Sequence, residues 1–467
     1  MFKDLYRGFF NSELFIDYVT NAVHPKTWMC GDWQKAFLSV AGNEFFEHMH
    51  ENHDYWKFID KLKPLSIWKL KTYQKHELYD KLVERLAKEM PQRQELPNQI
   101  IHTLEELNKT PEILTIGFAR RFATYKRAHL IFIDLKRLAS IVNNPQYPVR
   151  FIFSGKAHPS DKAGEDLIKR IIEVSRMPEF IGKIIFVENY DTELAKLLLK
   201  GVDVWLNTPT RPLEASGTSG MKAVMNGTLN FSVLDGWWAE GYVPGGGWAL
   251  RQENTYDDPN LQDQLDAEMI YSTIEDEIVP SFYERDIEGV PQKWIEMIKN
   301  AYFHIAPHFI TKRMLLEYDN KFYKQLFEYY KTLSDNDYQN LFKFISWKRK
   351  IYRNWDEIKL ENIEMFDSSK RHLPLGDKFY VKLLLDLKEL KPDDVIIELI
   401  FGKKEEGRIV DIEFAKTFDF VGCEGSKSKY ECTIPMEQSG VYNFSIRLRP
   451  QHPLLAHKQD FYLVRWL

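Results

Sequence analysis

Residues 202–227 read VDVWLNTPTRPLEASGTSGMKAVMNG, and this stretch decides the fold class. An apolar run at 202–207 is followed by a proline-containing turn at 208–212 and then by small residues and glycines that lead into a helical pattern. A buried strand that turns directly into a helix is the unit from which parallel α/β sheets are built. The turn also exposes backbone N–H groups at the start of the helix, where phosphate or sugar hydroxyls bind.

Lys222 follows this turn, in the part of the sequence that we expect to form the first turn of the helix. There the helix dipole disfavours an ammonium group and lowers its pKa, so the amine is suited to form a Schiff base with an aldehyde. Taken as an anonymous loop, the same residues favour a simpler interpretation, a link from strand to helix with a solvated lysine.

Strand-like and helical patterns alternate on both sides of this stretch. Apolar β-rich runs lie at 113–119, 149–154, 183–188 and 228–234, and the helical stretches include 162–175 and 192–200. This alternation predicts βαβ units, which means a parallel sheet with helices on both faces. We therefore expect a Rossmann-like domain over residues 111–350.

The two ends of the chain have other patterns. Residues 1–110 are mainly helical, whereas residues 351–370 are polar enough for a connector. Beyond them, apolar and polar residues alternate with a period of two in 379–388, 394–401, 408–416, 442–449 and 460–467. Short strands with no helix between them predict an antiparallel β-sandwich over residues 371–467.

Composition excludes several classes of protein. The 467 residues carry 63 basic and 68 acidic side chains in a mixed pattern, so nucleic acid is not an expected partner. No apolar run is long enough to span a bilayer and the start lacks a secretory signal, which favours a cytoplasmic protein without a membrane partner. The three cysteines, Cys30, Cys423 and Cys432, are too scattered for a disulfide framework or a metal site, so we expect buried free thiols.

Two further elements carry candidate chemistry. Four cations follow the predicted strand 113–119 within eight residues: Arg120, Arg121, Lys126 and Arg127. This arrangement predicts an anion site at the carboxyl end of the sheet, with a solvated basic helix end as the alternative. Tyr190 follows the predicted strand 183–188 and, taken alone, is a core or rim tyrosine.

The stretch from Glu214 to Lys222, the Asn226-Gly227 pair and the run 234–236 (Leu-Asp-Gly) together resemble the pyridoxal 5′-phosphate signature of the glycogen/starch (α-glucan) phosphorylase family. The resemblance implies that Lys222 anchors the cofactor. It also implies that Thr218, next to Gly217, meets the cofactor phosphate.

The same resemblance assigns substrate contacts. It implies that Glu214 and the Ser216-Gly217 turn hold hydroxyls of the transferred glucosyl unit, since a carboxylate accepts two hydrogen bonds at once. The family also carries an Arg-x-x-x-Tyr-Lys-Arg element like that at 121–127.

By position in this element, Arg121 and Lys126 are implied to clamp the substrate and cofactor phosphates, and they are the residues to which we assign catalysis. Tyr125 is implied to lie near the glucosyl site, and Tyr190 to donate its hydroxyl to the cofactor phosphate. No metal is implied.

The resemblance implies an activity and an architecture. The activity is reversible phosphorolysis, in which inorganic phosphate attacks an α-1,4-glucan and releases α-glucose 1-phosphate. The architecture is the C-terminal Rossmann-like lobe of a two-lobed, GT-B-like glycosyltransferase, with residues 1–110 a remnant of the inter-lobe region. The family's N-terminal lobe is missing, so the chain is a fragment, one piece of a split enzyme whose other lobe is a separate chain, or an inactive remnant.

Residues 236–242 (GWWAEGY) resemble the shorter bacterial and archaeal branch of the family. Two alternatives stay open. The chain is either a catalytically inactive lobe that binds glucan, cofactor or a partner, or a glycosyltransferase of the glycogen synthase type, which shares the two-lobed architecture without pyridoxal phosphate.

Overall fold

The computed structural model describes residues 5–109, 112–250, 256–365, 378–405, 408–435 and 443–467. By their internal contacts these residues form two compact units, Val19–Tyr318 and a second unit of Met1–Tyr18 with Asp319–Leu467. The domain boundaries expected near residues 110 and 371 lie outside the described residues. The division into three domains therefore stays a prediction.

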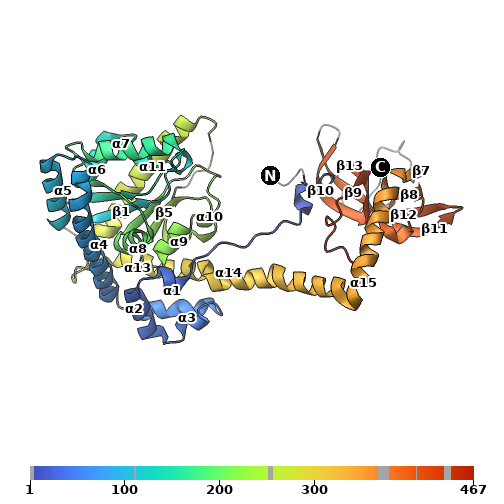
Figure 1. The fold of residues 1–467 in the computed structure, drawn as a ribbon, viewed down its shortest axis with the longest axis horizontal. Helices are drawn as coiled ribbons and strands as arrows, with labels where there is room; N and C mark the ends of the chain where they lie inside the picture. Colours follow the sequence, from blue (N-terminus) through green and yellow to red (C-terminus); the bar gives the residue numbers. More distant parts are fainter. Residues whose placement is uncertain (1–4, 110–111, 251–255, 366–377, 406–407, 436–442) are drawn as a thin grey trace. The chain divides into compact units, whose positions relative to one another are not determined.

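A six-stranded sheet forms the centre of the first unit (Figure 1), and its strands pair in parallel in the order β3-β2-β1-β4-β5-β6. The strands are β1 (Leu114–Ala119), β2 (Val149–Ser154), β3 (Ile184–Val187), β4 (Val204–Asn207), β5 (Leu229–Val233) and β6 (Gly247–Leu250). Nearly every strand residue is buried, as expected for a parallel sheet covered on both faces. The Rossmann-like fold class is confirmed.

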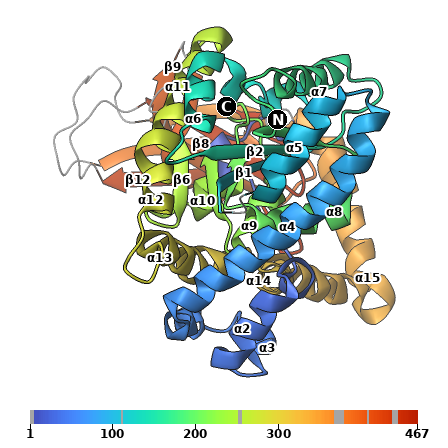
Figure 2. The same cartoon turned by 90° about the vertical axis from the view of Figure 1, so that its left-hand side faces the viewer.

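Helices cover both faces of this sheet. One face packs on α4 (Pro64–Gln92), α5 (Pro97–Lys109) and α8 (Thr192–Gly201), through a core that includes Leu82, Leu198 and Trp205. Figure 2 shows α4 and α5 in front of β1 and β2. The other face contributes Ile116, Phe151 and Phe231 to a larger core. The remaining helices of the unit are α1 (Pro25–Trp28), α2 (Gly31–Ala41), α3 (Phe45–His48), α6 (Leu135–Val142), α7 (Lys162–Ser175), α9 (Thr218–Val224), α10 (Trp237–Gly241), α11 (Pro259–Thr273), α12 (Val279–Tyr283), α13 (Gln292–Asn300) and α14 (Thr311–Tyr318).

The second unit is an antiparallel β-sandwich preceded by α15 (Lys324–Asn354), which is interrupted by non-helical backbone at 335–338. One sheet has the order β10-β9-β13-β14 and the other β11-β12-β8-β7. The strands are β7 (Lys359–Met365), β8 (Lys378–Asp386), β9 (Val395–Glu405), β10 (Arg408–Thr417), β11 (Asp419–Glu424), β12 (Lys427–Pro435), β13 (Asn443–Pro450) and β14 (Arg465–Trp466). Both sheets contribute to one core, for example through Leu383 and Leu399.

Several expectations differ from the structure. The connector expected at 351–370 contains the end of α15 and all of β7, whose side chains are mostly exposed and polar and so resemble a linker in sequence. Strand β6 has no counterpart among the predicted strands, because its start lies in the glycine-rich run 245–247. The alternation at 460–467 gives only the two-residue β14. Tyr442, at the start of the alternation that gives β13, lies outside the described residues.

Cys432 is buried and Cys30 is partly buried, but Cys423 is exposed on β11, so the expectation of a buried thiol is wrong for Cys423. In the described ranges, no helix combines the length and the apolar character that a bilayer crossing requires.

Candidate active site at the carboxyl ends of β1 and β4

Strands β1 and β4 are neighbours in the sheet, and between them the strand order changes direction. At such a switch point the connections that follow the two strands run to opposite faces of the sheet. A crevice therefore forms outside the carboxyl ends of these strands. The loops that begin at Arg120 and at Thr208 leave the sheet at this edge. These loops carry the cationic element and the turn before Lys222.

Two cations converge on one carboxylate at this edge. Arg120 donates from Nη2 to Oε2 of Glu214 at 2.9 Å, and the Nζ of Lys126 pairs with the same oxygen. Arg120 also donates from Nη1 to Oδ1 of Asn207, the last residue of β4, at 2.7 Å. Burial lowers the pKa of Arg120, although Glu214 acts in the opposite direction. The cluster is therefore a polar, largely desolvated site that brings two of the predicted residues, Lys126 and Glu214, together.

The turn that carries Glu214 is held in place by Asp235 and Gly236. The Asp235 carboxylate accepts the backbone N–H of Glu214 at 2.9 Å, and the Trp237 N–H donates to the carbonyl of Ser216 at 2.8 Å. Gly236 has a φ of 52°, and a Cβ there would lie 2.5 Å from the Ser216 carbonyl oxygen. The aspartate and glycine after β5 therefore position the Glu214 carboxylate.

The four cations of the 120–127 element have different environments. Arg127 is buried, donates to the carbonyls of Thr208 and Pro209, and pairs with Asp266 at 2.6 Å. Arg121 is exposed, and within the described ranges its guanidinium forms no hydrogen bond or ion pair. Arg127 thus has a structural position, whereas Arg121 is available to a ligand. The alternative of a uniformly solvated basic end is wrong.

Lys222 lies one turn later than expected. It is the fifth of the seven residues of α9, near the carboxyl end of the helix, where the dipole favours an ammonium. The pKa of Lys222 is nevertheless lowered, and the cause is burial. Its Nζ lies 3.7 Å from the ring centroid of Trp28, and within the described ranges it pairs with no carboxylate. The predicted direction of the pKa shift is right, but its predicted cause is wrong.

The remaining predicted residues surround these groups. Tyr190 follows β3 close enough to Arg120 for the two to interact, and burial raises its pKa to about 12, so its hydroxyl stays protonated and can donate. The Tyr125 ring lies 4.5 Å from the Nζ of Lys126. Gly217, with a φ of 87°, caps α9, and Thr218 is the first residue of that helix. No contact within the described ranges joins Lys222 to Glu214 or Lys126.

Several buried polar atoms near α9 have no hydrogen-bond partner in the structure. They are the Oγ of Ser216, both amide atoms of Asn230, and the Nε1 of Trp237. A Cβ on Gly220 of α9 would come within 2.7 Å of Asn230 Oδ1 and Trp237 Nε1, so the helix packs directly on these groups. Because buried polar atoms are normally paired, this set fits a site for a polar ligand.

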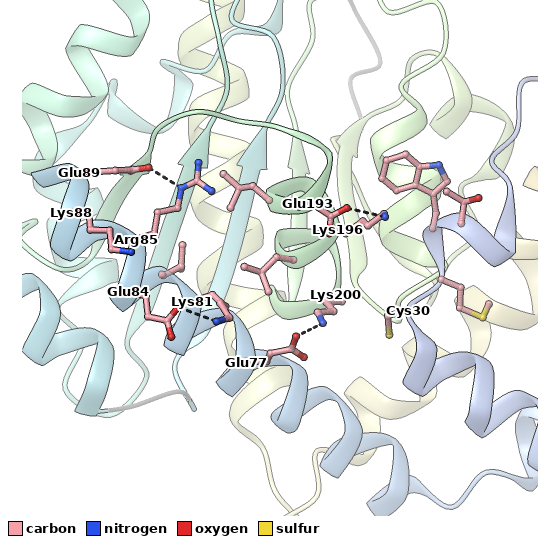
Figure 3. A pocket seen from close by; sticks show the side chains of 16 residues that line it. Cys30, Glu77, Lys81, Glu84, Arg85, Lys88, Glu89, Glu193, Lys196 and Lys200 are labelled. Carbon is pink, nitrogen blue, oxygen red and sulfur yellow. Dashed lines mark hydrogen bonds and ion pairs between the residues drawn. The ribbon is translucent and has the colours of Figure 1, made fainter. Parts of the chain in front are cut away.

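A separate pocket of about 630 Å³ lies between α4, α8 and residues 27–30 (Figure 3). Apart from Lys88, its charged groups pair with one another: Lys81 with Glu84, Arg85 with Glu89, Lys196 with Glu193, and Lys200 with Glu77. It contains none of the predicted site residues, although Trp28 lines it. No group of His, Cys, Asp and Glu in the described ranges is arranged to hold a metal ion.

The sequence pattern includes Arg120 among the four cations of the predicted anion site but does not pair it with Glu214, and it assigns no role to Asn207 or Trp28. Asn207 is the last residue of β4, and Arg120 immediately follows the last residue of β1. These positions at the carboxyl ends of adjacent strands are a signal that sequence could have provided. Trp28 has no such signal, since its contact with Lys222 joins residues 194 positions apart.

The parallel sheet with this strand order has the architecture of the C-terminal, Rossmann-like lobe of the GT-B fold, and the same chain also carries a β-sandwich. Residues 11–240 match the family model described as carbohydrate phosphorylase, and residues 355–467 match the glycogen phosphorylase C-terminal domain. The chain belongs to the glycogen (α-glucan) phosphorylase family.

Its relatives include the maltodextrin phosphorylase of Thermococcus litoralis, which is 37% identical over 100% of this chain and 54% of its own length. The glycogen phosphorylase of Aquifex aeolicus is 45% identical over 67% of this chain and 44% of its own length. The glycogen phosphorylase of Mycobacterium bovis is 31% identical over 99% of this chain and 53% of its own length. The chain spans about half the length of the curated relatives it matches.

Proposed function

We propose that this chain is the cofactor-carrying part of an α-glucan phosphorylase, which catalyses the reversible phosphorolysis of α-1,4-glucan to α-glucose 1-phosphate. The observation that carries the proposal is the convergence of Arg120 and Lys126 on Glu214 at the switch point of the sheet. Cations that hold an anion in a desolvated crevice suit a reaction with inorganic phosphate as nucleophile. The family match supports the same reaction.

The substrate contacts follow from the positions of the side chains. Arg121 is exposed and can grip phosphate through two parallel N–H donors, and Lys126 adds a compact charge beside it. Glu214 accepts hydrogen bonds from glucosyl hydroxyls once Lys126 turns to phosphate. Ser216 has a buried hydroxyl without a partner among the described residues for the same sugar, and Gly217 and Tyr125 are proposed to complete the glucosyl contacts.

Pyridoxal 5′-phosphate is the proposed cofactor, and the residues present fit it. Lys222 has an amine whose pKa is lowered by burial, which increases the neutral fraction that attacks an aldehyde. Thr218, Gly217 and the Tyr190 hydroxyl would hold its phosphate. When bound, the cofactor supplies a phosphate group that exchanges a proton with the substrate phosphate. The role of Lys222 is therefore to tether it.

The partners are part of the proposal. The chain spans about half the length of its relatives, and we propose that the other lobe and much of the glucan surface are contributed by residues beyond those of this sequence. Closing the crevice between two lobes would exclude water and strengthen the interactions of Arg121 and Lys126 with phosphate. A cytoplasmic location, without nucleic acid or membrane as a partner, stays a prediction.

Two measurements test the function. Phosphate release from glucose 1-phosphate in the presence of maltodextrin is measured for the chain alone and with added chains that carry the other lobe. Pyridoxal 5′-phosphate is then attached, reduced with borohydride and located by peptide mass spectrometry. We expect modification at Lys222, its loss in Lys222→Ala, and an unchanged result in Lys162→Ala, which removes an exposed lysine.

The alternatives give different results. Cofactor attachment at Lys222 without turnover under any condition would favour the inactive lobe. A Lys222→Ala variant that keeps the pyridoxal absorbance would contradict the cofactor assignment. The glycogen synthase-type alternative receives no support from the comparisons, since both family matches are to phosphorylases.

A further inference from the structure

Asn226 joins two segments of the chain through its side-chain amide. Its Nδ2 donates to the carbonyl of Trp28 at 2.7 Å and to the carbonyl of Lys222 at 2.9 Å. Its Oδ1 accepts the backbone N–H of Cys30 at 2.9 Å. The Asn226 side chain is almost completely buried. Its Nδ2 and its Oδ1 both form their hydrogen bonds with backbone groups.

The two carbonyls that Asn226 holds belong to residues that touch each other. The indole of Trp28 lies against the Nζ of Lys222, 3.7 Å from ring centroid to nitrogen. Trp28 ends α1, a helix of four residues that is too short to be stable without outside contacts. Trp28 packs partly against both cores of the first unit but also borders the open pocket of Figure 3, so packing does not enclose the indole on that side. The position of the indole therefore depends on the backbone contacts of residues 28–30.

Asn226 itself is held firmly. Its carbonyl accepts the indole N–H of Trp33 at 2.9 Å and the Nζ of the buried Lys71 at 3.3 Å. The hydroxyl of Tyr302 donates to the preceding carbonyl at 3.0 Å. Gly227 follows with a φ of 63°, and a Cβ there would lie 2.6 Å from the Trp33 ring. A rigid backbone at 225–227 lets the amide fix the segment 28–30.

We infer that Asn226 is a positioning residue for Lys222, because it clamps the backbone on both sides of the contact between the Trp28 indole and the Lys222 amine. The inference rests on the proposed function in taking Lys222 as the cofactor's anchor. The indole face attracts an ammonium but also keeps water from the amine, and because burial lowers the pKa of Lys222, desolvation is the larger of the two effects and favours the neutral, nucleophilic form. Asn226 thus acts on cofactor attachment without touching the cofactor.

The test measures the reactivity of Lys222 in the full chain without cofactor. The protein is labelled briefly with acetic anhydride at a series of pH values, and acylation of Lys222 is followed by peptide mass spectrometry. In Asn226→Ala we expect the midpoint of the pH profile to move upward by about half to one pH unit, because the amine becomes solvated. Asn226→Asp keeps the acceptor for the Cys30 N–H and loses both donors, and it should move the midpoint in the same direction.

A double-mutant cycle separates positioning from a general structural effect. Trp28→Leu should move the midpoint as Asn226→Ala does, and the double variant should move it no further, since both act through the indole. Asn354→Ala is the matched control, because the buried Asn354 also donates its Nδ2 to the carbonyl four residues earlier, at 3.0 Å. It should leave the Lys222 midpoint unchanged.

Two results would overturn the inference: an Asn226→Ala midpoint equal to that of the wild type, or additive shifts in the double variant. Both are read in the absence of cofactor. Failure of pyridoxal 5′-phosphate to attach to wild-type Lys222 is a different result, and it contradicts the proposed cofactor instead. The rate of cofactor attachment at fixed neutral pH is the second readout, and we expect it to fall several-fold in Asn226→Asp.

Discussion

Arg120 and Glu214 face each other from the loops that follow β1 and β4, with 2.9 Å between Nη2 and Oε2. The residues are 94 positions apart in sequence. They meet because β1 and β4 are adjacent at the centre of the sheet and both end at the same edge. The pair therefore links the cationic element to the turn before Lys222, the two segments on which the proposed function depends.

Replacing Glu214 by glutamine should destabilise the protein and create a phosphate site. Arg120 and Lys126 would lose their shared counter-charge in a largely buried environment, which costs about 2 kcal/mol of the free energy of unfolding. Inorganic phosphate should restore much of this loss, so the melting temperature of Glu214→Gln should rise more with phosphate than that of the wild type. Chloride at equal ionic strength is the control, and an equal response of both proteins to phosphate would contradict the prediction.

Substitution of Arg121 should weaken phosphate binding, whereas substitution of Arg127 should lower the stability of the protein. Arg121→Ala removes an exposed side chain without partners, so its free energy of unfolding should stay within about 0.5 kcal/mol of the wild type while phosphate stabilises the protein less. Arg127→Ala leaves Asp266 buried and uncompensated, and it should cost about 3 kcal/mol. Urea unfolding with and without phosphate measures both effects. Equal destabilisation by the two substitutions would refute the distinction.

Gly236→Ala should displace the turn that carries Glu214. A Cβ at this position would lie 2.5 Å from the Ser216 carbonyl oxygen and 2.8 Å from that of Glu214, and both atoms are backbone. We expect a loss of about 3 kcal/mol in the free energy of unfolding together with weaker phosphate binding. Gly289→Ala is the control, since Gly289 also has a positive φ, 74°, but open space around its Cβ position. It should cost only about 1 kcal/mol.

Glu13 should make the β-sandwich unit sensitive to acid. Burial alone would raise the Glu13 pKa, but hydrogen bonds from Arg447 and Lys458 outweigh it and lower the pKa to about 2. Because this value lies below the ordinary 4.5, the stabilisation is fully present above about pH 4.5 and is lost as the pH falls toward 2.

Glu13→Gln should therefore cost about 2 kcal/mol at pH 7 and progressively less below pH 4.5, as measured by urea unfolding of both proteins across this range. Asp17→Asn is the control. Asp17 lies in the same segment and pairs with Lys321 at the surface, so its removal should have little effect. A Glu13→Gln deficit that persists unchanged at pH 3 would contradict the prediction.

Much of the first unit could be predicted because its strands are buried on both faces. The runs that gave β1, β2 and β5 are mainly apolar, and α7 begins at Lys162 as predicted. β6 could not be found in this way, because Gly247 and its neighbours resemble a loop and form a strand only by pairing with β5. β11 was not predicted because it is mostly exposed and is defined by pairing rather than by an alternating pattern. β12 was not predicted either, although its buried Tyr430, Cys432 and Ile434 alternate with more exposed residues and the sequence could have shown it.

The sequence by itself determined the family, the alternation of strands and helices, and the segments in which we propose the site, because these depend on residue type and local spacing. Only the tertiary structure decided the burial and the partners of each charged side chain. It distinguished Arg127, which is buried and paired with Asp266, from the exposed Arg121. It also showed that Lys222, in the last turn of α9, lies against the ring of Trp28. The physical reason is that burial and charge pairing depend on contacts between residues far apart in the chain, which no local pattern encodes.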